Sequence, residues 1–459
     1  MATRTESAPQ TIRAAWILWL ILLAALGIRL IYGFSLEPEI FWHDGREYSR
    51  LAKSILETGA YLTPEGNPTA LWPPGYPFLL ALIYALFGTS VMAVRAVQAV
   101  MGAATCYLVY LLGLRLLGWR QALLSAALAA IYPLFIYTTG TLYPVVLVTL
   151  LIAAVFLLAL DAVERSSGMR ALAAGLLSGW AVLAVAAVLP ALLLTSLWIF
   201  WEAARKRAPE AARPGSPRCW GRGVKLALLF LAPLVLMVGT WTWRNTQAFG
   251  RPVLVSNNGG YNFWMGNYPS VTASTGGRWM PGMAEEYNDI HRRYQNEAEV
   301  DRALLERGLE HAMADPGRFA GLTIAKAFNL WRLYPQPMTH ERPHQGVERI
   351  ASILSYGLLL PFALIWLLRS LRRSPPARLV LLLWLSFSFV YAFFISKVRF
   401  RIPLDTFIIL YASGGLIALV ACLAGVLKRR GIRWSWLSAL TGERPKRLEQ
   451  GASRRRFRN

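Results

Sequence analysis

Long uninterrupted apolar segments constrain this chain more than any other feature. They are about 20 residues long, the length that an α-helix needs to cross a hydrocarbon core of about 30 Å. Hydrophobic residues make up 55% of the sequence, above the roughly 45–50% of an ordinary soluble protein. The first segment, residues 14–33, is not followed by a small-residue cleavage site, so we expect a retained helix and not a signal peptide. The sequence thus predicts an all-α polytopic membrane protein.

The apolar segments predict about ten spanning helices, within a range of roughly 8–12. They lie at residues 14–33, 90–114, 121–138, 141–160, 171–187, 189–201, 226–243, 350–368, 379–395 and 402–425. A shorter apolar segment, residues 76–87, would be only about 18 Å long as a helix. We expect that segment to lie at the interface or to re-enter the membrane. With the N-terminus inside, the long exterior loops are residues 34–89 and 244–348.

The positive charge follows this topology. The formal net charge is +23, and Lys and Arg collect in loops that the span order places on one side, as is typical of cytoplasmic loops. We therefore interpret the charge as a topological signal, expect no nucleic-acid partner, and place both termini in the cytoplasm. Residues 1–425 would form the membrane domain. Residues 426–459 would form a basic cytoplasmic tail that contacts membrane lipids.

The exterior loops are expected to contain helices that lie on the membrane. In the first loop, apolar residues recur at helical spacing from Tyr48 onward, and Gly59 is placed to end that helix. In the second loop we expect one helix over about 284–314. A second helix would begin at Pro316, with Asp315 as its N-cap. This second helix has an apolar face that suits the membrane surface.

One group of cations breaks the orientation rule. The cations at the outer boundary, between the last two predicted spans, are Lys397, Arg399 and Arg401. No acidic residue follows them until Asp405. An anionic ligand would compensate their charge, and a lipid phosphate has the charge and depth required. Arg244 and Arg95, near the outer ends of two other spans, could join them. Alternatively, these side chains only snorkel from helix ends to lipid headgroups.

The first exterior loop supplies a carboxylate at the same boundary. Asp44 stands at the start of its predicted helix, where it could take a proton from an acceptor hydroxyl while the cations stabilise a leaving phosphate. The alternative is that Asp44 is only an N-cap, with Glu47 completing a capping box. His43 and Glu47 could suggest a metal ion, but no further acidic cluster accompanies them. We therefore expect no metal site.

Several short segments follow one another in an order that points to a known family. They are Asp44-Gly45-Arg46-Glu47-Tyr48, Trp72-Pro73-Pro74-Gly75-Tyr76-Pro77, Arg95 with Gln98, Trp243-Arg244-Asn245, Gly259-Gly260-Tyr261-Asn262 and Arg399-Phe400-Arg401-Ile402-Pro403-Leu404. Together they resemble the membrane glycosyltransferases of superfamily C (GT-C). The branch they resemble contains the lipid A aminoarabinose transferases and the protein O-mannosyltransferases. The resemblance covers roughly residues 14–420.

The resemblance implies an inverting, metal-independent glycosyltransferase, for which we expect no cofactor. The Ala-, Leu- and Arg-rich composition suggests a bacterium, so we expect a bacterial inner membrane. The enzyme would take a sugar from a polyprenyl-phosphate carrier on the exterior side, with Asp44 as the general base. The residues expected to bind substrate are Lys397, Arg399, Arg401, Arg244, Arg95, Glu47, Tyr48 and Tyr76. The acceptor stays open between lipid, polysaccharide and protein.

The sequence departs from the family pattern in one place. Many relatives carry an acidic residue near the outer start of the fourth span, where this chain has Thr141-Leu142-Tyr143-Pro144. The sequence therefore gives no support to a second catalytic carboxylate. The alternative function is a transporter or flippase of lipid-linked sugars. A transporter would place ionisable residues or broken helices at mid-membrane, whereas the polar residues here gather at the outer boundary, which favours the transferase.

Overall fold

The computed structural model describes residues 8–206, 219–334 and 345–429, and every regular element in these ranges is helical. The expectation of an all-α polytopic protein is thus confirmed. The elements are α1 (Ala8–Ser35), α2 (His43–Thr58), α3 (Gly75–Phe87), α4 (Val91–Leu116), α5 (Trp119–Ile131), α6 (Pro133–Thr139), α7 (Val145–Arg165), α8 (Gly168–Ala184), η1 (Ala186–Val188), α9 (Leu189–Arg205), α10 (Trp220–Phe249), α11 (Gly259–Asn267), α12 (Met283–Arg293), α13 (Glu297–Ala314), α14 (Pro316–Leu330), α15 (Gln345–Ser352), η3 (Ile353–Gly357), α16 (Leu358–Leu371), α17 (Pro375–Phe393), η4 (Val398–Arg401) and α18 (Ile402–Arg429).

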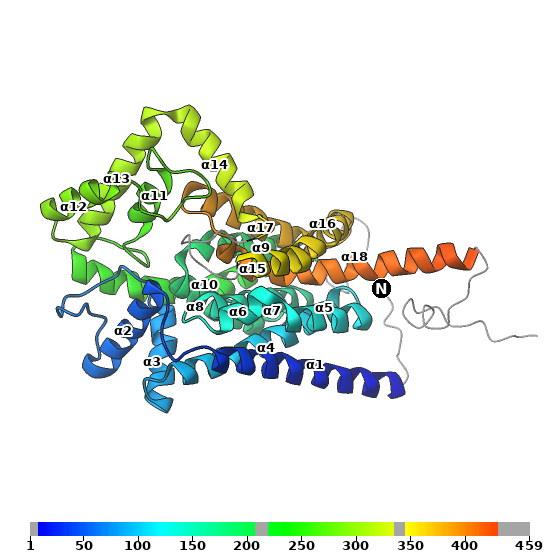
Figure 1. Ribbon diagram of the computed structural model, residues 1–459. Coiled ribbons are helices and arrows are strands. Elements are labelled where there is room, and N and C mark those ends of the chain that lie inside the picture. The colour runs from blue at the N-terminus through cyan, green and yellow to red at the C-terminus, as the bar shows by residue number, and fades with distance from the viewer. Residues whose placement is uncertain (1–7, 207–218, 335–344, 430–459) are drawn as a thin grey trace, which may run out of the picture.

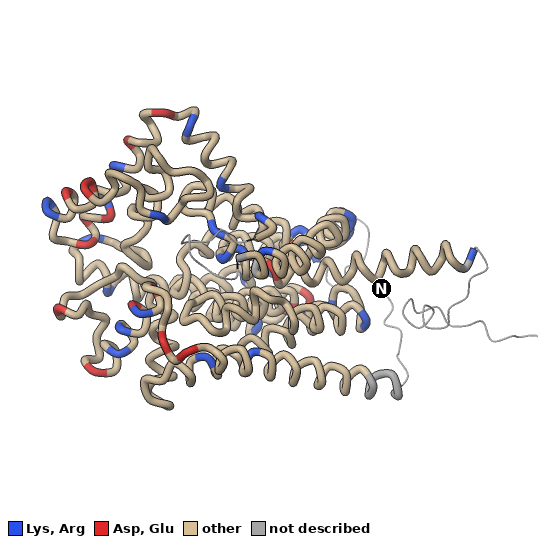
Figure 2. Tube along the Cα trace, in the orientation of Figure 1, with Lys and Arg blue, Asp and Glu red and all other residues tan. Residues whose placement is uncertain are grey.

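The long helices lie side by side in one bundle (Figure 1). The helices α2, α3 and α11–α13 gather at one end of the bundle, whereas α1 begins and α18 finishes at the opposite end. Figure 2 shows acidic and basic residues mixed around α11–α13, while the long helices carry few charges. The predicted tail beyond residue 429 lies outside the described residues.

Within the described residues, eight helices are long and apolar enough to cross a membrane, and the bent pair α5–α6 makes a ninth. Helix α8 is also apolar, but has 17 residues, or roughly 26 Å. These ten elements coincide one for one with the predicted segments, which agrees with the expectation of about ten spans. Helix α3, predicted as interfacial or re-entrant, has only 13 residues.

The third predicted span is a bent pair of helices, not one straight helix. Pro133 has no backbone N–H to donate to the carbonyl of Ala129, and α5 and α6 meet at 50°. The buried guanidinium of Arg29 in α1 donates to the carbonyls of Ala129 and Ala130, each at 3.0 Å. A Cβ at Gly102 would lie 2.6 Å from Nε of Arg29, so this glycine makes room for the side chain. Arg29 thus satisfies backbone groups where a membrane offers no water.

The second predicted exterior loop folds into α11–α14. The helix predicted over 284–314 is interrupted, because Asn296 caps α13 separately by accepting a hydrogen bond from the N–H of Ala298 at 2.9 Å. Asp315 caps α14 by accepting from the N–H of Arg318 at 2.9 Å, and Pro316 is the first helical residue, as predicted. Phe328 of α14 is 74% exposed, which is consistent with a face that contacts lipid.

Candidate functional site

Asp44 lies in the first turn of α2, and its side chain does not cap that helix. The N-cap residue is Trp42 and no side chain accepts a hydrogen bond there, so the interpretation of Asp44 as an N-cap is wrong. Gly45 lets this turn approach the bundle closely, because a Cβ at Gly45 would lie 3.1 Å from the carbonyl oxygen of Leu142. This close contact brings Asp44 beside Tyr143.

Asp44, Tyr143 and Arg399 form one contact group from three separate parts of the chain. The Tyr143 hydroxyl donates to Oδ2 of Asp44. Nη1 of Arg399 donates to the Tyr143 hydroxyl at 3.2 Å, and its Nη2 lies 3.7 Å from Oδ2 of Asp44. The guanidinium carbon also lies 4.9 Å from the centroid of the Tyr143 ring. A carboxylate and a cation thus meet at the end of the bundle that carries α2 and α11–α13 (Figure 1).

The group is accessible from outside the protein. The side chains of Arg399 and Asp44 are 33% and 28% exposed. Nε of Arg399 has no hydrogen-bond partner among the described residues, although it is buried. A guanidinium with an unused donor and an exposed edge can bind a further anion.

Lys397 lies close to the same group, and it interacts with Arg278, a residue that the sequence analysis did not single out. Its Nζ would lie 2.6 Å from a Cβ at Gly277, so the ammonium packs against the backbone of the segment between α11 and α12. Burial first, together with the charges of Arg399 and Arg278, lowers the pKa of Lys397 to about 8, while the charge of Asp44 opposes the shift. Two other cations, Arg399 and Arg278, therefore lie within electrostatic range of Lys397. No local pattern marks Arg278, because only tertiary folding brings its loop here.

An aromatic layer lies beneath Asp44. The Tyr48 ring, one helical turn later, is 6.0 Å from the Tyr143 ring and 5.4 Å from the Tyr76 ring. Burial first, and the negative charge of Asp44 second, raise the pKa of Tyr48. The hydroxyl of Tyr76 donates to Oε1 of Gln98 at 2.9 Å. Tyr143 of the contact group therefore packs against the ring of Tyr48, which in turn packs against the ring of Tyr76.

Glu47 is engaged within its own helix. Its Oε2 accepts from Nε of Arg50 at 3.1 Å, an i,i+3 pair on the surface of α2. Among the described residues, the ion pair of Glu47 is therefore with Arg50 and not with Arg399.

Arg95 and Arg244 bind backbone carbonyls instead of facing Asp44. Arg95 is 1% exposed and donates to the carbonyls of Gly140 and Glu39, at 3.1 and 3.2 Å. It thereby holds both the loop before α2 and the loop before Tyr143. Arg244 donates to the carbonyls of Tyr61 and Thr69, at 2.9 and 2.8 Å, and so fixes the loop between α2 and α3. Both arginines can shape the site without touching a ligand.

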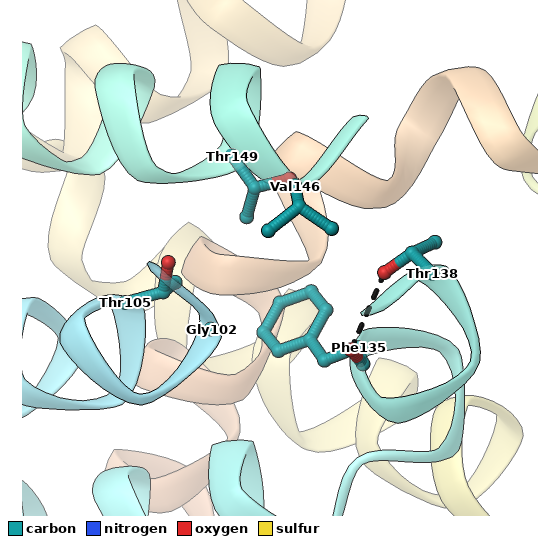
Figure 3. A pocket seen from close by; sticks show the side chains of 6 residues that line it. All are labelled: Gly102, Thr105, Phe135, Thr138, Val146 and Thr149. Carbon is teal, nitrogen blue, oxygen red and sulfur yellow. Dashed lines mark hydrogen bonds between the residues drawn. The ribbon is translucent and has the colours of Figure 1, made fainter. Parts of the chain in front are cut away.

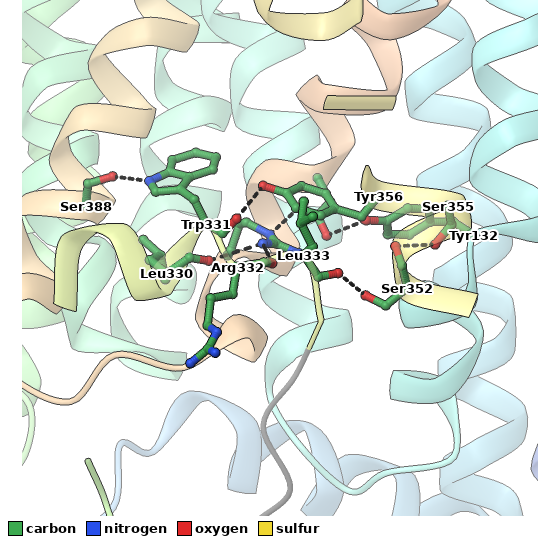
Figure 4. Close-up of polar contacts among 11 residues, drawn as sticks. Tyr132, Leu330, Trp331, Arg332, Leu333, Ser352, Ser355, Tyr356 and Ser388 are labelled. Carbon is green, nitrogen blue, oxygen red and sulfur yellow. Dashed lines mark hydrogen bonds and ion pairs between the residues drawn. The ribbon is translucent and has the colours of Figure 1, made fainter. Parts of the chain in front are cut away.

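Arg401 is fully buried in a separate network. Its Nε donates to Oδ1 of Asp405 at 3.0 Å, and its Nη1 donates to the carbonyls of Leu330 and Arg332. Its guanidinium carbon lies 3.5 Å from the centroid of the Tyr356 ring. Figure 4 shows the end of α14 lying among side chains of the spanning helices at this point. The structure therefore separates Arg401 from Arg399, two residues away, and gives it internal partners.

One small pocket lies between three helices of the bundle, and Asp44 is not among its lining residues. Its lining comes from α4, α6 and α7 and consists of Gly102, Thr105, Phe135, Thr138, Val146 and Thr149 (Figure 3). The three threonine hydroxyls donate to carbonyls of their own helices. Within the described residues, no group of three or more His, Cys, Asp or Glu side chains could hold a metal ion.

Comparison with known proteins gives the site its family context. Residues 72–237 match the family model described as dolichyl-phosphate-mannose-protein mannosyltransferase. A protein of Aquifex aeolicus (strain VF5), described as uncharacterized, is 30% identical over 119 residues, which is 25% of this chain and 24% of that protein. The segment that matches the family model, residues 72–237, includes Tyr76, Arg95 and Tyr143. It begins after Asp44 and ends before Arg399.

Two solved structures share the fold over almost the whole chain. One is the archaeal oligosaccharyltransferase AglB from Archaeoglobus fulgidus in complex with an inhibitory peptide and a dolichol-phosphate, with 16% identity, a TM-score of 0.54, and coverage of 96% of this chain and 53% of that one. The other is the apo oligosaccharyltransferase of Archaeoglobus fulgidus, with 16% identity, a TM-score of 0.54, and coverage of 95% and 54%. This chain thus spans about half the length of the solved structures it matches. The family-model match and this shared fold both agree with the resemblance to the GT-C superfamily of membrane glycosyltransferases.

Proposed function

We propose that this protein transfers a sugar from a polyprenyl-phosphate carrier to an acceptor hydroxyl on the exterior side of a bacterial inner membrane, with inversion at the anomeric carbon. Asp44 is the general base, and Arg399 and Lys397 hold the donor phosphate. The single observation that carries the proposal is the contact of Asp44 with Arg399, 3.7 Å apart. It joins a proton acceptor and a phosphate-binding cation in one exposed group.

The proposed reaction uses each member of this group once. The acceptor oxygen attacks the anomeric carbon, its proton passes to the Asp44 carboxylate, and the bond between the anomeric carbon and the phosphate oxygen breaks. The carrier leaves as a polyprenyl phosphate that has gained negative charge, which fixed cations stabilise. Arg399 can turn from Asp44 toward the phosphate, because its Nε has no partner among the described residues. Tyr143 then keeps the carboxylate in place through its hydroxyl.

Two further observations support a lipid-phosphate donor. The group stands where the spanning helices end, so that a carrier whose chain lies in the membrane would present its phosphate at the right depth. AglB, which shares the fold, was solved with a dolichol-phosphate. Arg401 is not part of the proposed phosphate site, because its guanidinium is buried and paired with Asp405.

The test is sugar transfer by the full chain in lipid nanodiscs. A panel of undecaprenyl-phosphate-linked sugars serves as donor, a cell-envelope extract serves as the source of acceptor, and released undecaprenyl phosphate is measured. Asp44→Asn keeps the size of the side chain but cannot accept a proton, so we expect a loss of about 10²–10⁴-fold in rate. Glu57→Gln, which changes an exposed carboxylate of the same helix, is the matched control and should keep the wild-type rate.

Two results would count against the proposal. A folded Asp44→Asn protein with the wild-type rate would remove the base from the mechanism. Wild-type protein that moves a lipid-linked sugar across a bilayer without releasing undecaprenyl phosphate would favour the transporter instead.

A further inference from the structure

The segment 394–397, which leads from α17 to the cations of the site, has no regular structure of its own. It runs from the end of α17 to Lys397 and then into η4, which carries Arg399. Its backbone carbonyls therefore depend on other parts of the chain for hydrogen bonds. Whatever holds this segment also determines where the ammonium of Lys397 and the guanidinium of Arg399 lie.

Four buried polar side chains hold this segment, and we name them the Lys326 cluster: Lys326, Asn267, Asn329 and Ser396. Their exposures are 1%, 0%, 8% and 2%. They come from α14, from the end of α11 and from the segment itself. The cluster therefore ties the exterior helices to the last turn of a spanning helix.

Lys326 is the centre of this cluster. Its Nζ donates to the carbonyl of Phe394 at 2.8 Å, to Oδ1 of Asn267 at 2.9 Å, and to the carbonyl of Phe393 at 3.5 Å. An ammonium has three protons to donate, so these three acceptors use all of them. The Phe393 and Phe394 carbonyls stand at the C-terminus of α17, where the helix dipole favours a positive charge.

The other members complete the attachment. Nδ2 of Asn267 donates to the Phe393 carbonyl at 2.8 Å, and Nδ2 of Asn329 donates to the Ser396 carbonyl at 2.9 Å. The Ser396 hydroxyl donates in return to the Lys326 carbonyl at 2.8 Å. Three carbonyls of the connection, those of Phe393, Phe394 and Ser396, are thus held from outside.

We propose that Lys326 is a positioning residue for the phosphate-binding cations: by fixing the segment 394–397, it holds Lys397 and Arg399 where a lipid phosphate can bind both. Lys326 cannot bind the ligand itself, because it is buried and its donors are already used. Burial also lowers the pKa of Lys326 to about 7, with Arg318 adding to the effect. This inference rests on the proposed function, since it presumes that the two cations bind a phosphate.

The test is the binding of undecaprenyl phosphate to the full chain in nanodiscs. Lys326→Met keeps the length of the side chain but donates no hydrogen bond, and should raise the Kd about tenfold, or about 1.4 kcal/mol, because the cations lose their position. Lys326→Arg keeps charged donors and should recover most of the affinity. Lys225→Met, at an exposed lysine near the start of α10, is the matched control and should bind as wild type does.

The Kd distinguishes positioning from general stability. A variant that merely folds less well presents fewer binding sites, but each site keeps the wild-type Kd. If Lys326→Met does not fold, Ser396→Ala removes one bond of the cluster and should raise the Kd in the same direction by a smaller factor.

The outcomes separate this inference from the proposed function. Wild-type protein that does not bind undecaprenyl phosphate would overturn both. Wild-type protein that binds, together with a folded Lys326→Met or Ser396→Ala protein of unchanged Kd, would overturn the inference and leave the proposed function standing. Equal losses in Lys326→Met and Lys326→Arg would also overturn it, because retained donors would then have no effect.

Discussion

Arg399 and Arg401 stand two residues apart, and the structure predicts opposite consequences when each is replaced by Met. Arg401 is 0% exposed and its partner Asp405 is also 0% exposed. Arg401→Met leaves the buried Asp405 carboxylate with the Tyr132 hydroxyl, at 2.9 Å, as its remaining side-chain hydrogen-bond donor among the described residues. Breaking one side of a buried ion pair costs about 3–5 kcal/mol. We expect a loss of that size in the free energy of unfolding.

Arg399→Met should affect binding instead of folding. Its ion pair with Asp44 is about one third exposed, and such pairs contribute about 0–1 kcal/mol to stability. A charge-assisted hydrogen bond to a phosphate is worth about 1.5–3 kcal/mol. Its loss should raise the Kd for undecaprenyl phosphate by roughly 10–100-fold.

The assay is unfolding by sodium dodecyl sulfate in mixed micelles, paired with the binding measurement in nanodiscs. The double variant Arg401→Met/Asp405→Leu is the internal control. It removes the uncompensated charge, so it should be more stable than Arg401→Met alone. It should stay below wild type, because the carbonyls of Leu330 and Arg332 still lack the donor that Arg401 supplied. A stable Arg401→Met protein that no longer binds the phosphate would refute the reasoning, since Arg401 would then be a ligand residue.

Two further predictions concern the cations Lys397 and Arg29. Lys397, with a pKa of about 8, loses its positive charge as the pH rises, so the affinity for undecaprenyl phosphate should fall between pH 7.5 and 9.5, by up to about tenfold per pH unit. Lys397→Arg should flatten this pH dependence. A wild-type affinity that does not change over this range would contradict the prediction. Arg29→Met leaves the Ala129 and Ala130 carbonyls without the Arg29 donor. It should lower the free energy of unfolding by about 2–4 kcal/mol, measured in the same micelles. A variant as stable as wild type would show that the bend between α5 and α6 needs no side-chain support.

The positions of the spans could be predicted because the membrane imposes one length and one polarity. Each predicted segment coincides with an observed element, although the structure adds a turn or more at several ends, as in α10 (Trp220–Phe249) against the predicted 226–243. The bend at Pro133 could have been foreseen, since proline interrupts helical hydrogen bonding. The role of Arg29 in that bend could not, because its partners are about a hundred residues away in sequence.

The candidate site could be predicted in part, because its cations violate the rule that Lys and Arg collect in cytoplasmic loops. Cations on the predicted exterior side suggested an anionic partner, and the structure places one of them, Arg399, beside Asp44. The ion pair of Arg401 with Asp405 could also have been predicted from the sequence. Arg401 and Asp405 are four residues apart, the spacing at which opposite charges pair on a helix.

Tyr143 and Lys326 show two different limits of sequence reasoning. Tyr143 carries no local pattern, and its hydroxyl reaches Asp44 only because α2 packs against the start of α7. The position of Lys326 could be noticed in the sequence, because Leu322 precedes it and Leu330 follows it by four residues each, so that the lysine interrupts an apolar helical face. A lysine on such a face needs internal partners, although the sequence could not name them.

The contacts of the site also determine how many helices cross the membrane. Asp44 and Tyr143 touch, so an even number of crossings separates them, and among the described helices this requires α4 and the bent pair α5–α6 to cross once each. Asp44 and Arg399 also touch, so the crossings between them are even as well. Without α8 they would be α4, α5–α6, α7, α9, α10, α16 and α17, an odd number that would put the carboxylate and the cation on opposite sides. Helix α8, although only 17 residues long, must therefore cross. A thinner stretch of bilayer or a tilt of its neighbours would accommodate its length.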